Sequence, residues 1–89
     1  MSVRDQAFLA KSKAGHDKNH VYVVLKCEDD MAYLVNGTTR KVDNPKRKKL
    51  MHIQPITHLS RDISEILDNG ALTDKDVIEV LERYLGQLN

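Results

Sequence analysis

The chain has 89 residues and a mass of 10.2 kDa, which allows one small hydrophobic core and makes a deep, water-excluding active site difficult to build. Apolar residues make up 40% and charged residues 30% of the chain, a composition that argues against wholesale disorder. The net charge of +1 conceals two unlike halves, because residues 1–58 hold eleven Lys and Arg against six Asp and Glu (+5), whereas residues 59–89 hold three against seven (−4). The basic half is suited to a polyanionic partner.

The sequence predicts a cytoplasmic protein without a membrane partner. No apolar stretch approaches the roughly 20 residues that cross a bilayer, and the first residues lack the hydrophobic run of a signal peptide. The single cysteine, Cys27, excludes an internal disulfide and a multi-cysteine metal site, which fits a reducing compartment.

The basic half carries the period-two pattern of short β-strands. Runs of β-branched and aromatic residues predict strands at residues 6–10, 21–25, 31–35 and 50–53. The acidic run 28–30 predicts a turn, and Asn36-Gly37 predicts a tight hairpin, with Gly37 as its structural turn residue, before a further extended segment at residues 38–42. Since no helix crosses between these strands, we expect a small antiparallel barrel or strongly bent sheet.

Two short helices are predicted after Pro55. Ser60 can cap a helix over residues 61–68 that Gly70 stops, and Thr73 with Asp76 forms a capping-box pattern for a second helix that we expect to fray at Gly86. The apolar stripe of the second helix consists of Val77, Val80, Leu81, Tyr84, Leu85 and Leu88. Helices this short are not stable alone in water, so the stripe must dock on the barrel, on its neighbour or on another molecule. The small barrel needs cover and is the expected site.

The predicted architecture is mostly β with C-terminal helices. Composition and hydrophobic period both switch at residues 57–59, which separates a barrel at residues 1–58 from a helical hairpin at residues 59–89. We interpret the switch as a linker within one structural unit, in which the hairpin packs on the barrel.

Basic residues are the strongest functional signal. Four consecutive cations, Lys46, Arg47, Lys48 and Lys49, form either a solvated loop or a phosphate-contacting surface, because like charges repel one another unless water or an anion compensates. A second cluster in the loop after the first strand favours phosphate contact: Lys11, Lys13 and Lys18. Further candidates for phosphate contact are Arg40, Lys41, His16, His20 and His52.

The segment from about Asp5 to Met31 contains a predicted strand, Gly15, Asp17-Lys18 and Val21-x-Val23-Val24. With these features it resembles the KOW motif of ribosomal proteins and transcription elongation factors. Together with residues 34–42, 44–50 and 52–55, the segment resembles the KOW domain of the fourteen-e group of large-subunit ribosomal proteins and, more closely, the related small bacterial KOW-domain RNA-binding proteins. Many members have a second glycine where Asn19 stands, so the turn at residues 14–20 requires a left-handed backbone at Asn19 or a remodelled loop.

The resemblance, which covers about residues 5–56, implies an SH3-like barrel of the translation-protein type that binds structured RNA, typically ribosomal RNA. Duplex RNA is recognised largely through backbone shape and charge, and lysine-rich loops suit that task. With one Phe, three Tyr and no Trp, a stacking surface for single strands at Tyr22 or Tyr33 is disfavoured, because both positions alternate like core or sheet-face residues.

Enzymatic and metal chemistry find little support in the sequence. His16 and His20 are not patterned with a carboxylate or thiolate, and the chain has no nucleophile elbow, glycine-rich phosphate loop or working carboxylate pair, so we predict no metal, cofactor or catalytic residue. The leading hypothesis is a non-enzymatic RNA-binding protein in translation or ribosome assembly. Two alternatives stay open: a protein-interaction module that uses the acidic helices, and a transcription elongation-type KOW module.

Overall fold

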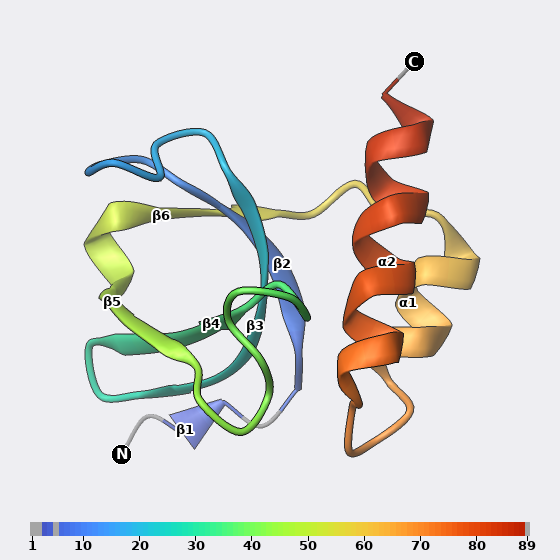
Figure 1. Ribbon diagram of the computed structural model, residues 1–89, viewed down its shortest axis with the longest axis horizontal. Coiled ribbons are helices and arrows are strands. Elements are labelled where there is room, and N and C mark those ends of the chain that lie inside the picture. The colour runs from blue at the N-terminus through green and yellow to red at the C-terminus, as the bar shows by residue number, and fades with distance from the viewer. Residues whose placement is uncertain (1–2, 5, 89) are drawn as a thin grey trace.

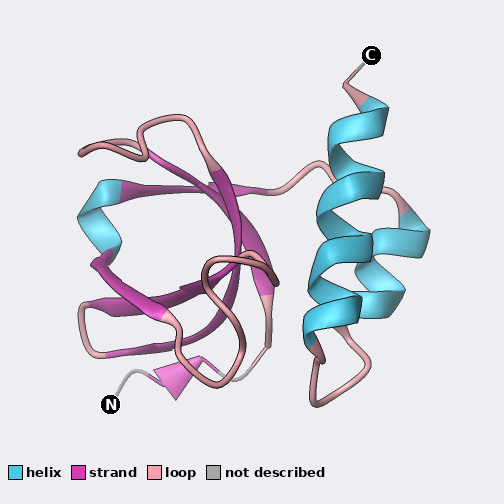
Figure 2. Ribbon diagram, in the orientation of Figure 1, coloured by secondary structure: helices cyan, strands magenta, loops and turns pink. Residues whose placement is uncertain are grey.

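The computed structural model describes residues 3–4 and 6–88, which form a curled antiparallel sheet and two helices packed against one side of it (Figure 1). The strand order is β5-β4-β3-β2-β6, and β1 pairs with β3. Figure 2 shows the strands curling into a small barrel-like layer, whose end strands β5 and β6 follow one another in the chain through a short 3₁₀ turn, η1. The elements of this layer are β1 (Val3–Arg4), β2 (Phe8–Ser12), β3 (Val21–Glu28), β4 (Met31–Val35), β5 (Lys46–Lys49), η1 (Leu50–His52) and β6 (Ile53–Ile56).

The central hairpin of the sheet agrees with the sequence. The strands predicted at residues 21–25 and 31–35 are confirmed as parts of β3 and β4, which are joined at Asp29 and Asp30. Asp29 takes the left-handed backbone that this tight connection needs, with φ 56°. The strand predicted at residues 6–10 is displaced by two residues, since β2 is Phe8–Ser12.

Two strand predictions are wrong. Residues 38–42 form a loop because the Asn36 side-chain oxygen accepts hydrogen bonds from the backbone N–H groups of Thr38 (3.0 Å) and Arg40 (2.9 Å), which folds the chain back on itself in place of a two-residue hairpin. The four cations at residues 46–49, expected in a loop, form strand β5, and the strand predicted at residues 50–53 is mostly the 3₁₀ turn η1.

Both faces of the sheet bury apolar side chains. The cluster inside the curl consists of Ala10, Tyr22, Val24, Cys27, Ala32, Leu34 and Ile53. On the outer face, Leu9, Val23 and Val35 pack with residues of the two helices. Because successive side chains of a strand point to opposite faces, the neighbours Val23 and Val24 belong to different clusters, which accounts for the continuous apolar run of β3.

The helices α1 (Arg61–Leu67) and α2 (Asp74–Gln87) cover this outer face (Figure 1). The capping box at Thr73 is confirmed, and the stripe of α2 docks on the sheet as expected, with Val77 and Val80 fully buried. The helix α2 ends at Gln87, one residue past Gly86. The end of the stripe extends beyond the sheet, where Leu85 is 50% and Leu88 64% exposed.

A close backbone contact fastens the loop after β4 to the start of α2. The Val42 N–H donates a hydrogen bond to Asp74 Oδ1 at 2.8 Å. Gly37, with φ 83°, lies so near the helix that a Cβ atom there would be 2.6 Å from Ile78 Cγ1 and 2.8 Å from the Asp74 carbonyl oxygen. Both the backbone conformation and the lack of space therefore require glycine.

We predict that Gly37→Ala lowers the free energy of unfolding by about 2–4 kcal/mol, because it adds left-handed strain to a clash with α2. Gly86→Ala is the matched control: nothing lies within 4 Å of its added Cβ, and alanine's helix propensity should raise stability by about 0.5–1 kcal/mol. Urea unfolding followed by circular dichroism measures both effects. A stable Gly37→Ala variant would contradict the close contact.

Candidate nucleic-acid interface

A buried carboxylate, Asp17, organises the end of the barrel between β2 and β3. Asp17 is 7% exposed, and the two oxygens of its carboxylate accept four side-chain hydrogen bonds. The neutral donors are Ser12 Oγ at 2.9 Å and Tyr22 Oη at 3.1 Å. The charged donors are Lys46 Nζ at 2.8 Å and Lys48 Nζ at 3.0 Å. Every lone-pair direction of the carboxylate is thus supplied with a donor in a part of the molecule from which water is largely excluded.

Strand alternation divides the basic run 46–49 into two pairs. Lys46 and Lys48 lie opposite two buried residues of β4, so their side chains enter the barrel interior, where they are 32% and 11% exposed. Arg47 and Lys49 lie on the outer face and are exposed. The run therefore has two functions in the structure, one inside the barrel and one on its surface.

The ionisation of this network follows from its contacts. Burial by itself raises the pKa of Asp17, but the hydrogen bonds from Lys46, Lys48, Ser12 and Tyr22 outweigh it and hold that pKa well below its ordinary value. Burial, together with the adjacent Asp17 carboxylate, raises the pKa of Tyr22 to about 12. With two ammonium groups sharing one ionised carboxylate, the network retains an excess of one positive charge.

The network also brings the two basic segments of the sequence together. Asp17 and Lys46 are 29 residues apart in the chain, yet their charged groups are in contact. Lys48 Nζ donates a further hydrogen bond to the Ala14 carbonyl at 2.9 Å, and the Lys13 N–H donates to the His52 carbonyl at 2.8 Å. The loop at residues 13–20 is therefore held against β5 and η1, at the end of the barrel far from α1 and α2 (Figure 1).

The turn that carries Asp17 depends on two left-handed residues. Gly15 has φ 86° and Asn19 has φ 75°, so both residues are in the left-handed region. Asn19 therefore adopts the backbone conformation that the turn needs where a second glycine is absent. Hydrogen bonds from Asn19 N to Ser12 O (2.8 Å) and from His20 N to Asp17 O (2.9 Å) close the turn. This geometry directs the Asp17 side chain inward and its neighbours outward.

The other predicted contact residues differ in their surroundings. Those with exposed side chains are Lys11, Lys13, His16, Lys18, His20, Lys41, Arg47 and Lys49, while Arg40 and His52 are half-buried. Within residues 6–88, none of the exposed Lys and Arg side chains in this set forms an ion pair with a described carboxylate. Lys41 lies apart from the rest, in the loop that docks on α2 through its neighbour Val42.

An acidic turn limits the basic surface on one side. The Leu50 N–H donates to the Asp30 carbonyl at 2.8 Å, which places the acidic connection of β3 and β4 next to the end of β5. The carboxylates of this turn repel anions, so the side of Arg47 and the 13–20 loop is the more favourable one for an anion.

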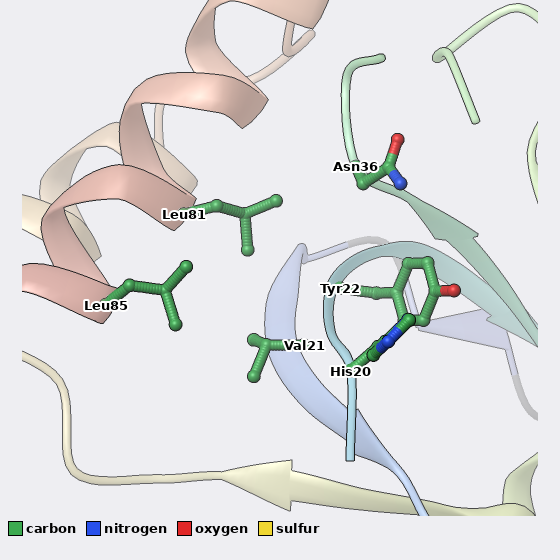
Figure 3. Close-up of a pocket in the computed structure, with 6 residues that line it drawn as sticks. All are labelled: His20, Val21, Tyr22, Asn36, Leu81 and Leu85. Atoms are coloured by element: carbon green, nitrogen blue, oxygen red, sulfur yellow. The ribbon is translucent and has the colours of Figure 1, made fainter. Parts of the chain in front are cut away.

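A pocket of about 300 Å³ lies between the barrel and α2, and His20 at the end of the 13–20 loop contributes to its lining (Figure 3). Leu81 and Leu85 of α2 face Val21 across it, whereas the ring of Tyr22 points away from α2 into the barrel. The remaining lining residue is Asn36. Its walls are mainly apolar, which suits an apolar side chain better than a charged substrate.

No protein-family model matches the chain, and no curated protein matches its sequence. In the part of the chain that the structure describes, no three His, Cys, Asp or Glu side chains are grouped as metal ligands are. No helix within those residues is long and apolar enough to cross a bilayer.

We predict that Asp17→Asn lowers the free energy of unfolding at pH 7 by about 3–5 kcal/mol, because it leaves the buried ammonium group of Lys48 and the partly exposed one of Lys46 without a counter-charge. The exposed loop residue Asp43 supplies the control, and Asp43→Asn should change stability by less than about 0.5 kcal/mol.

The same pair of variants defines a pH dependence. Because the pKa of Asp17 is lower in the folded protein than in the unfolded chain, its ionised form stabilises the fold above the unfolded-state value of about 4. That contribution is lost as the pH falls below about 4 toward the folded pKa. Urea unfolding between pH 7 and pH 2 should show the free energies of unfolding of the parent and of Asp17→Asn becoming more alike as the pH falls. A difference between them that is the same at every pH would contradict the ionised network.

Proposed function

We propose that this protein is a non-enzymatic RNA-binding protein that holds structured RNA, such as ribosomal RNA, by its backbone phosphates and acts in translation or ribosome assembly. One observation carries the proposal: the Asp17 network joins two basic segments into a single surface at one end of the barrel. A small β-barrel of the SH3-like KOW type, followed by helices, is the architecture that we propose for this role.

The charges of the basic end support phosphate contact without base readout. Lys13 and Lys18 on the loop, and Arg47 and Lys49 on β5, are exposed and unpaired within the described residues. Such side chains attract phosphate at long range, and the planar guanidinium of Arg47 matches two phosphate oxygens. Shape and charge are the features by which duplex RNA is largely recognised.

The lysines inside the barrel have a supporting function in this proposal. The ammonium group of Lys48 donates hydrogen bonds to Asp17 and to the Ala14 carbonyl. In this proposal Lys48 therefore positions the loop and does not contact the RNA directly. Lys46 is more exposed and provides the excess positive charge of the network at the surface. RNA binding therefore depends on the outer pair of the run for contact and on the inner pair for geometry.

A second candidate function is a protein-interaction module, which the exposed end of the α2 stripe favours. Leu85 and Leu88 extend beyond the sheet next to the apolar pocket that Leu81 and Leu85 line. Most of the stripe packs against the barrel, however, since Val77 and Val80 are fully buried. Within the stripe, the exposed part is thus limited to the last turn of α2, and we rank this function second. A transcription elongation-type module would share the barrel and differ in its partner.

We predict that parental protein binds a structured ribosomal RNA fragment with a log–log salt slope of about −3 to −5, and that Arg47→Gln/Lys49→Gln flattens the slope by about one to two units. Fluorescence anisotropy across a salt series measures both slopes. The control, Arg61→Gln/Lys75→Gln, removes the same charge from exposed positions on the helices and should leave the slope unchanged. Equal effects of the two double variants would refute a localised phosphate surface.

The second candidate function makes a separate prediction. If the end of α2 is an interface, parental protein should self-associate or bind a partner in a way that Leu85→Ser/Leu88→Ser abolishes, with RNA affinity unchanged. Sedimentation equilibrium over a range of concentrations tests self-association. A parental protein that remains monomeric at all concentrations argues against a second copy of this chain as the partner.

A further inference from the structure

A β-bulge in β3 determines where Lys26 points. Val24 pairs with Leu34, and the next pair is Lys26 with Tyr33, so Leu25 is an extra residue in the strand. Without it, strict alternation would direct Lys26 into the barrel beside Val24. With it, Lys26 reaches the outer face and Leu25 packs with the outer cluster.

The bulge completes a row of three side chains across the outer face. Tyr33 of β4 is the register partner of Lys26 on one side and of Arg47 on the other. Lys26 Nζ lies 4.8 Å from the centroid of the Tyr33 ring. The Arg47 side chain is exposed, and opposite residues in such a pair have Cβ atoms about 4.5–5.5 Å apart, within reach of a guanidinium. Tyr33 thus has a cationic residue as its strand neighbour on each side, and the ammonium group of Lys26 lies over its ring.

This row lies beyond the part of the sheet that the helices cover. Val35, two residues along β4 on the same face, is fully buried in the cluster that the helices share, whereas Tyr33 is only half-buried. The aromatic ring of Tyr33 is therefore partly exposed on the outer face. Alternation along β4 disfavours Tyr33 as a stacking residue because it predicts a core or sheet-face position, and the structure places it on the sheet face beyond the cluster that the helices share.

The charges around the ring indicate which ligand fits. Lys26 is partly neutralised by Glu28, whose Oε1 lies 3.2 Å from Lys26 Nζ, while Arg47 forms no ion pair with the described carboxylates. A ligand that offers a flat ring for Tyr33 and a negative charge for Arg47 matches both groups. Unpaired nucleotides have this combination, and base stacking on aromatic rings beside cations is the usual means of binding single strands.

We propose that Lys26, Tyr33 and Arg47 form a stacking site for an unpaired base of single-stranded RNA. The base stacks on the Tyr33 ring, and Arg47 holds an adjacent phosphate on the side away from the acidic turn at residues 28–30. The site rests on the proposed function and extends it, since a structured RNA held at the basic end of the barrel would present a single-stranded segment to this face.

The test compares two RNA probes, a decamer of uridine and a fully paired duplex. Tyr33→Thr replaces one strand-favouring residue with another but removes the ring, and should weaken binding to the uridine decamer about 5- to 100-fold at an unchanged salt slope. Tyr33→Phe keeps the ring and should bind within about twofold of the parent. Duplex affinity should be unaffected in both variants, and quenching of tyrosine fluorescence by the decamer should decrease in Tyr33→Phe.

Failure of the stacking site is distinguishable from failure of the proposed function. Parental binding to the duplex but not to the decamer, or equal decamer affinity of parent and Tyr33→Thr, overturns the stacking site and leaves duplex binding intact. If Tyr33→Thr loses binding to both the decamer and the duplex, the stacking site is also overturned, because the ring would then be needed for the folded structure and not for stacking on a base. Absence of parental binding to either probe overturns both proposals.

Discussion

The carboxylate of Asp17 is the interaction on which the geometry of the basic end depends. It replaces the water that Lys46 and Lys48 lose inside the barrel, and it fixes the 13–20 loop against β5. Buried ion pairs seldom add much net stability compared with well-packed apolar side chains, because desolvation offsets most of the attraction. Their best-supported use is to specify one arrangement among several, and here the arrangement specified is the juxtaposition of two basic segments.

The secondary structure was predictable where pattern and local chemistry agree. The hairpin of β3 and β4 and the capping box at Thr73 follow from alternation, turn residues and helix-start chemistry. The segment 38–42 departs from its pattern because the Asn36 side chain offers the backbone hydrogen bonds that compete with a strand ladder. The bulge at Leu25 also escapes sequence analysis, since it arises from the pairing of two strands.

The candidate site was predictable in composition but not in geometry. A run of four cations has no hydrophobic alternation, so the sequence contains nothing to show that Lys46 and Lys48 turn inward. Their tolerance of the interior depends on one carboxylate far away in the chain. The sequence gives only a weak indication that Asp17 is the partner of these lysines: it is a single acidic residue in a basic turn after the strand that ends at Ser12. The pairing of Asp17 with Lys46 and Lys48 becomes visible only in the folded structure.

The separation of charge along the molecule has a further consequence. The basic end of the barrel and the acidic helices lie on opposite sides of the structure (Figure 1), so the protein has a permanent electric dipole across its long dimension. In the field of a polyanion this dipole produces a torque that turns the barrel end inward before contact. In the proposed complex with RNA, α1 and α2 would form a negatively charged outer surface, which repels further nucleic acid.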